Sequence, residues 1–428
     1  MNRLSASILM AVAGALAAPA QTTLEACHAA AEQHYPQARR LQLIDDTRDY
    51  TLANIRKGRL PQIEVTAQTR LQSDVTQLPV NLEALGLAGV TQPRLKRNQH
   101  TVAVDISQSV YDGGRRRAAE ALARQQAETD RSETETGLYA LRERVDALFF
   151  GLLLLDEQLR LNALLQDHLA TEARRIASCV RNGVAQAADS AAVEVERLRA
   201  RQQAEGYAAL RQGYVGQLAL LTGLPLDTAS TFVRPRPRPE AADEAQADNR
   251  RPELRFFAAQ AGLLHTRQKS VAAGLRPQLS LFAQGGYGRP GLDMFADSFE
   301  PYGVIGARIS WNISALYTRK AQLAQIQTDR AAVEAQRDAF LTDTRQQAIR
   351  QQAEIARLRR LLAADDRIIA LREEIRRASE QKVAGGTLSG TELMRDVNAE
   401  QEARLDKALH ETQLLQAQYG WLFTLNAY

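Results

Sequence analysis

Polar and apolar residues alternate in four short segments of the chain. The segment 61–71 places Ile63, Val65 and Leu71 on one side of an extended chain and Glu64 on the other. Because successive side chains of a strand point to opposite faces, this alternation predicts a β-strand with one apolar face. The same pattern appears in three further segments, which are 101–110, 279–288 and 302–313. Each is about 10 residues long, the length of a tilted strand that crosses a membrane, although an ordinary half-buried sheet explains the alternation equally well. Aromatic residues stand near the ends of these segments, as at a membrane interface, namely Tyr111, Tyr287, Tyr302 and Trp311.

Long segments with a helical composition follow the strands. The ranges 114–181 and 317–383 contain no proline and are rich in Ala, Gln, Arg and Glu, which favours helix. At ~1.5 Å per residue, each would span about 100 Å. Shorter helices are predicted at 24–58, 187–222, 251–273 and 390–426. Since Ala often stands where a globular core would use Leu, we expect the rods to pack sideways against like helices rather than to form a compact core.

The order of elements occurs twice along the chain. Pro36 and Pro61 recur as Pro252 and Pro277 at the same spacing, and the turn at Gly183 recurs in the second half. We therefore expect a signal peptide at 1–20, a first repeat at 21–233, a linker at 234–249 and a second repeat at 250–428. The linker contains alternating Arg and Pro, which favours an extended polyproline segment, and a ligand for a proline-recognition domain is the alternative.

The first 20 residues have the pattern of a secretory signal. Arg3 precedes an apolar run from Leu4 to Ala18, and small residues end it. A buried N-terminal helix is the alternative. No later apolar run approaches the ~20 residues that a membrane helix needs, so we expect any membrane insertion of the mature chain to use strands.

Composition points away from catalysis, metal binding and nucleic acid. The 54 basic and 50 acidic residues give a net charge of +4 and are interspersed, as on solvated helix faces. The six histidines form no ligand motif, and the G-x-G-x-x-G at 286–291 lies where a strand and a loop are predicted instead of a helix. We expect no enzyme activity, cofactor or metal.

The two cysteines, Cys27 and Cys179, are predicted to be free thiols. Lipidation of Cys27 is the alternative, but the polar residues before it disfavour this modification.

The number of strands bears on assembly. One chain supplies four, and the two edges of a four-stranded sheet are not tolerated in lipid. Three copies would supply twelve strands, and bacterial outer-membrane barrels have an even number of strands. The predicted fold class is therefore α+β and internally duplicated, with four strands per chain in a trimeric outer-membrane β-barrel that continues as a periplasmic α-helical barrel of coiled-coil hairpins.

Six segments resemble the TolC-type outer-membrane efflux proteins. These are TLEACHAAAEQHYP, RLPQIEV and SVYDGGRRRAA in the first half, and LRPQLSLF, WNISALYTRKAQ and VAGGTLSGTEL in the second. The resemblance implies a homotrimeric channel-tunnel in the bacterial outer membrane that extends into the periplasm. Its implied function is the exit duct of a tripartite efflux pump, with a periplasmic adaptor and an inner-membrane transporter as partners. The outer-membrane component of type I protein secretion is an alternative.

The resemblance also implies where functional residues lie. The family often narrows its periplasmic mouth with acidic residues just after the helix turn. Glu392 and Asp189 match that place in the two repeats, Arg395 occupies the second acidic place, and Asp396 follows it. A solvated helix face is the other reading of Asp396. The turns themselves are candidate adaptor contacts, namely Asn182, Gly183, Gly385 and Gly386. A plain helix hairpin is the alternative reading of these turns.

A rival from a different class is a periplasmic coiled-coil scaffold or adaptor without a pore. It would explain the helices but neither the four membrane-length strands nor the duplication.

Overall fold

The computed structural model describes residues 22–75, 96–183, 185–237, 250–293 and 297–426. The predicted signal peptide, most of the predicted linker and much of the loop after the first strand lie outside these residues. The chain forms two compact units, one from residues 1–40, 134–252 and 339–428, the other from 41–133 and 253–338. Each unit draws on both halves of the sequence. This is a different division from the predicted repeats, whose boundaries stay a prediction.

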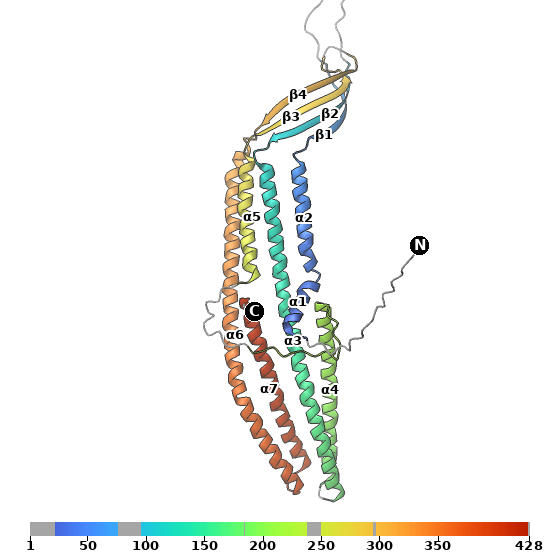
Figure 1. Ribbon diagram of the computed structural model, residues 1–428, viewed down its shortest axis with the longest axis vertical. Helices are drawn as coiled ribbons and strands as arrows, with labels where there is room; N and C mark the ends of the chain where they lie inside the picture. Colours follow the sequence, from blue (N-terminus) through green and yellow to red (C-terminus); the bar gives the residue numbers. More distant parts are fainter. Residues whose placement is uncertain (1–21, 76–95, 184, 238–249, 294–296, 427–428) are drawn as a thin grey trace, which may run out of the picture. The chain divides into compact units, whose positions relative to one another are not determined.

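In the described residues, one antiparallel sheet lies at the end of the helices of the second unit (Figure 1). Its strands are β1 (Gln62–Leu71), β2 (Asn98–Tyr111), β3 (Gln278–Arg289) and β4 (Glu300–Ser310), in the order β1-β2-β3-β4. The strands of the two halves meet directly, because β2 pairs with β3. The four predicted strands are confirmed. The last prediction extended too far, since Trp311 lies beyond the final paired residue, Ser310.

The long helices begin soon after the strands. These are α3 (Arg115–Arg181) and α6 (Ala315–Ala384), which contribute residues to both units and confirm the two predicted rods within a few residues. Asp112 helps α3 to begin, because its carboxylate accepts hydrogen bonds from the backbone N–H groups of Gly114 and Arg116, both at 3.0 Å.

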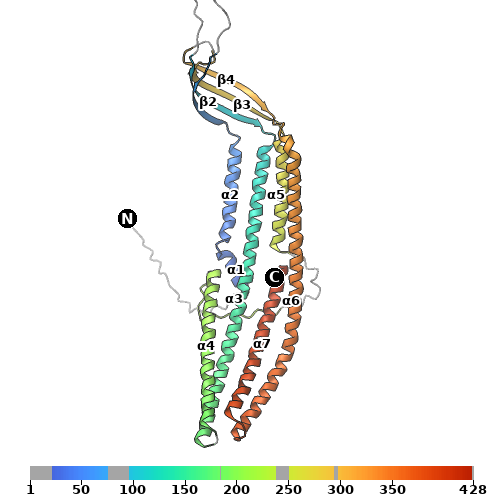
Figure 2. The ribbon, with the colours of Figure 1, turned by 180° about the vertical axis from the view of Figure 1, so that it is seen from behind.

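Three shorter helices also match their predictions. They are α4 (Ala187–Thr222), α5 (Pro252–Gly274) and α7 (Gly390–Leu425). Figure 2 shows α4 beside the C-terminal part of α3, and α7 beside the C-terminal part of α6. No described helix combines the length and the apolar character needed to cross a membrane.

The single helix predicted at 24–58 is wrong, because the structure breaks it at Pro36. It consists of α1 (Leu24–His34) and α2 (Ala38–Lys57). Tyr35 adopts an extended backbone, with φ −62° and ψ 134°. A residue before proline is driven out of the helical region by the proline ring, which accounts for the break.

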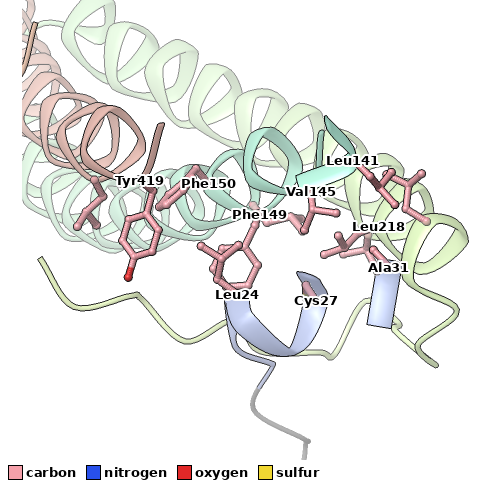
Figure 3. Packing of buried hydrophobic residues seen from close by; sticks show 13 residues of the cluster. Leu24, Cys27, Ala31, Leu141, Val145, Phe149, Phe150, Leu218 and Tyr419 are labelled. Carbon is pink, nitrogen blue, oxygen red and sulfur yellow. The ribbon is translucent and has the colours of Figure 1, made fainter. Parts of the chain in front are cut away.

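A compact apolar cluster lies in the first unit, at the level where α1, α3, α4 and α7 meet (Figure 3). Leu24, Cys27 and Ala31 recur at helical spacing on α1 and are all almost fully buried. Phe149 and Phe150 of α3 are buried in the same cluster. The expectation that the rods form no compact core is therefore wrong here, since α3 carries large apolar residues at this level rather than Ala.

A second cluster packs α3, α4, α6 and α7 together near the two helix turns. Its buried members are Leu169, Ile176, Val193, Ala200, Val383, Leu393, Met394 and Val397. This packing fixes the ends of the two helix hairpins relative to each other within the first unit.

Candidate functional site

One face of the sheet is apolar and exposed. The register aligns Ile63 of β1 with Ile106 of β2, and then with Ala283 and Ile305 on β3 and β4. Ile305 is 86% exposed and Ile63 is 68% exposed. Large contiguous apolar surfaces are uncommon on soluble proteins, and this one continues across all four strands. It is suited to contact with lipid hydrocarbon.

The opposite face is polar. Glu64, Asp105 and Gln284 lie in one row across three strands. The Gln284 amide donates a hydrogen bond of 2.6 Å to Asp105, and the Arg308 guanidinium lies 5.0 Å from the centroid of the Phe282 ring. This face is suited to contact with water, so the sheet separates two kinds of environment.

The aromatic residues near the strand ends divide between the two faces and the sheet margin. Tyr111, Tyr287 and Trp311 are each about half exposed, and the Trp311 indole N–H donates to the carbonyl of Leu275 at 2.9 Å. Tyr302 differs, because its ring lies over Gly286 on the polar face. The prediction that Tyr302 belongs with the interfacial aromatics is therefore wrong.

The two helix turns are exposed. Gly183 has φ +74° and Gly386 has φ +69°, left-handed conformations in which glycine avoids a steric clash. Asn182 and Gly385 continue the hydrogen bonding of the helices before them, to Ser178 and Gln381 respectively. All four predicted tip residues are thus accessible.

Asp189 holds the starts of α4 and α7 together. Its Oδ2 accepts a hydrogen bond of 3.1 Å from the backbone N–H of Gln186, and its Oδ1 accepts one of 2.9 Å from that of Gly390. A Cβ on residue 390 would lie 2.9 Å from the Asp189 Cβ, so a glycine is required at that position. The carboxylate that was predicted to line a constriction is therefore engaged in helix capping.

Glu392 has a similar role in α7 but remains exposed. Ser389 accepts a hydrogen bond from the Glu392 N–H at 3.2 Å, and the Ser389 N–H donates to Glu392 Oε2 at 3.3 Å. This is a capping box, and its Ser-x-x-Glu signature is visible in the sequence. Ser389 is thus a capping residue that the sequence-based predictions do not include.

The two remaining candidates point to different neighbours. Asp396 is half-buried and accepts a hydrogen bond of 2.6 Å from the Ser379 hydroxyl on α6. Its reading as a solvated helix face is therefore wrong. Arg395 is exposed and lines a groove of about 600 Å³ between α4 and α7. Asn398, on the same groove, donates to Glu196 at 3.1 Å, a contact between the two halves that no local pattern signals.

Both cysteines are free thiols, as predicted. Cys27 is completely buried in α1 as an ordinary helix residue, whereas Cys179 is half-buried near the first turn. Burial, reinforced by the Glu25 carboxylate, raises the pKa of the Cys27 thiol to about 12.

No protein-family model and no curated protein sequence matches the chain. Solved structures do match it over nearly its whole length. The outer-membrane protein VceC of Vibrio cholerae has a TM-score of 0.67 and 14% identity, covering 94% of this chain and 95% of VceC. CusC, whose structures address transmembrane channel formation, has a TM-score of 0.72 and 12% identity, and the match covers 95% of this chain and 92% of CusC. The MtrE outer-membrane channel of Neisseria gonorrhoeae, in its open state, has a TM-score of 0.66 and 16% identity, and the match covers 94% of this chain and 88% of MtrE.

Proposed function

We propose that this chain, whose fold is that of the TolC-type outer-membrane efflux proteins, forms a homotrimeric exit duct in the bacterial outer membrane. The observation that carries the proposal is the sheet, which has a continuous exposed apolar face, a polar face and two open edges. A scaffold or adaptor confined to the periplasm would have no use for the apolar face.

Strand direction supports closure by several copies. The three pairings in the sheet are antiparallel, so β1 and β4 run in opposite directions. The β4 edge of one copy can then pair antiparallel with the β1 edge of the next. Three copies close a barrel of twelve strands, which satisfies every edge and turns the polar faces toward a water-filled interior.

The duct is passive and serves a tripartite pump. An inner-membrane transporter supplies the cargo, and a periplasmic adaptor joins the transporter to the duct. The exposed tips at Gly183 and Gly386 are the surface that meets the adaptor. The tube itself selects no class of small molecule, because cargo is chosen by the inner-membrane partner.

Reconstitution in a planar bilayer tests this function. Protein purified in detergent should give stable, discrete conductance steps, since a closed barrel conducts whenever its ends are open. Protein that remains folded but never conducts, in repeated insertions under varied voltage, would contradict the proposal.

We further propose that the exposed Glu392 and Arg395 line the periplasmic mouth. The change Glu392→Lys removes one negative charge and adds one positive charge per chain at this place, so block of single channels by multivalent cations should weaken severalfold. Measurement of the blocking concentration at low salt checks this, because exposed charges are screened over about 10 Å at 0.1 M.

A matched control separates charge from helix capping. Ser389→Ala breaks the same capping box without altering charge, and it should leave cation block unchanged. Equal effects of Glu392→Lys and Ser389→Ala would show that the mouth is perturbed through folding and would remove Glu392 from the constriction.

A further inference from the structure

A histidine and two glutamates come together between α3 and α6 in the first unit. His168 and Glu172 lie one helical turn apart on α3, and Glu380 faces them from α6. Each offers one ligand atom, and these atoms all lie within 4.8 Å of one another. The His168 Nε2 is 3.7 Å from Glu380 Oε1. The sequence predicted no metal-ligand cluster, because these three residues converge only in the folded chain.

The three side chains retain free donor atoms. His168 Nε2 is buried and has no hydrogen-bond partner among the described residues. Arg175 donates twice to Glu172, at 3.0 and 2.6 Å, but both bonds go to Oε2. Arg376 contacts Oε1 of Glu380. Among the described residues, Oε1 of Glu172 and Oε2 of Glu380 accept no hydrogen bond, so each carboxylate offers one oxygen to a further ligand.

We propose that His168, Glu172 and Glu380 form a binding site for a divalent transition metal of the zinc class. One imidazole and two carboxylates are ligands that Zn²⁺ accepts, at about 2.0–2.2 Å. The ligand atoms lie within 4.8 Å of one another, so side-chain rotations would have to bring them closer to a shared ion. Three protein ligands leave a position for water, so the ion would be held at an open site.

The surrounding arginines orient the ligands rather than fill the site. Arg175 also donates to the main-chain carbonyl of Glu380 at 2.9 Å, so it links the Glu172 carboxylate on α3 to the main chain of α6. Hydrogen bonds of this kind hold metal-ligating carboxylates in place. Arg376 contacts Glu400 as well as Glu380, and so keeps a carboxylate partner when Glu380 binds the ion.

An access route lies beside the histidine. A groove of about 230 Å³ is lined by His168, Arg376, Val397 and Glu400 among others. Glu172 is largely buried, whereas Glu380 and His168 are partly exposed. A hydrated ion can therefore reach His168 from this groove. Bound metal would link the two long helices, one from each half of the chain.

Zinc binding to the purified full-length protein tests the site. Equilibrium dialysis against Zn²⁺, with metal counted by mass spectrometry, should find one ion per chain. His168→Ala and Glu380→Gln should each weaken binding about 10- to 100-fold. Co²⁺ in place of Zn²⁺ should give the visible absorption of a low-coordinate site, and His168→Ala should abolish it.

The matched control is another histidine that pairs with a carboxylate. His410 Nδ1 lies 2.8 Å from Asp365 Oδ2 in the same unit, but within the described part of the chain these two residues belong to no group of three potential metal ligands. His410→Ala should bind zinc as the unaltered protein does. His168→Gln, which keeps the side-chain volume, replaces His168→Ala if the latter loses its helical content. Failure to bind zinc, or equal binding by the His168 and Glu380 variants and the unaltered protein, would overturn the proposal, and neither result depends on channel activity.

Discussion

Asp189 shows how one side chain can join elements that are far apart in sequence. Its two carboxylate oxygens cap the first turns of α4 and α7, which begin about 200 residues apart. Helix starts leave backbone N–H groups without partners, and a carboxylate there satisfies them and suits the helix dipole. The side chain therefore fixes the two hairpins to each other close to their turns.

Removing this carboxylate should loosen both helix starts. Asp189→Ala leaves the N–H groups of Gln186 and Gly390 unsatisfied, which costs about 1 kcal/mol at each cap. Hydrogen exchange should then be about fivefold faster in the first turns of both α4 and α7. Asp167→Ala is the control, because this exposed carboxylate lies within α3, far in sequence from the first turns of α4 and α7. Faster exchange in α4 alone would contradict the shared cap.

Cys27 should make the folded protein less stable at high pH. Its pKa is about 12 in the folded chain against 9.0 for a free thiol, so the folded state holds the proton more tightly. The resulting stabilisation is complete below pH 9 and is lost as pH rises from 9 toward 12. Urea unfolding at pH 8 and pH 10 should show a larger loss for the unaltered protein than for Cys27→Ala. Equal losses in the two proteins would contradict the raised pKa.

At the scale of elements, local pattern predicted most of the fold. A strand is signalled by alternation over a few residues, as around Val65 and Val104, and these strands are confirmed. A long helix is signalled by a run without proline, as before Cys179, and this rod is also confirmed. The break at Pro36 was also local, but it was read as part of one helix. The capping box at Ser389 was equally readable and was missed.

Contacts between distant segments could not be predicted in the same way. The pairing of β2 with β3 and the bond from Gly390 to Asp189 join residues from different halves of the chain. Nor does any short pattern bring Glu380 to His168. The candidate site at the helix turns stays a prediction from resemblance, whereas the hydrogen bonds that its side chains make within and between helices required the structure.

The two faces of the sheet should differ in their tolerance of charge. Ile305→Lys places a charge on the apolar face, where it should cost about 2–4 kcal/mol near the middle of a bilayer and reduce assembly in the outer membrane. Ser107→Lys adds the same charge to an exposed position on the polar face and should be tolerated. Heat-modifiable migration of the outer-membrane fraction measures both. Equal loss in the two variants would contradict the assignment of faces.

At the scale of the whole molecule, the two edges of the sheet explain why several copies of the chain must assemble. The edge strands are β1 and β4, and no strand in the described part of the chain pairs with the outer row of backbone groups on either one. In lipid such groups cost several kcal/mol each unless a partner strand satisfies them. Only another copy offers strands of the same length, twist and facial pattern, so assembly and membrane insertion are one process for this fold.

The native mass of the detergent-extracted protein tests this claim most directly. The account predicts a species of three chains, because three copies complete a closed barrel and leave no strand edge exposed. A folded, stable species of one chain would contradict it, since that chain would keep both edges of its sheet open.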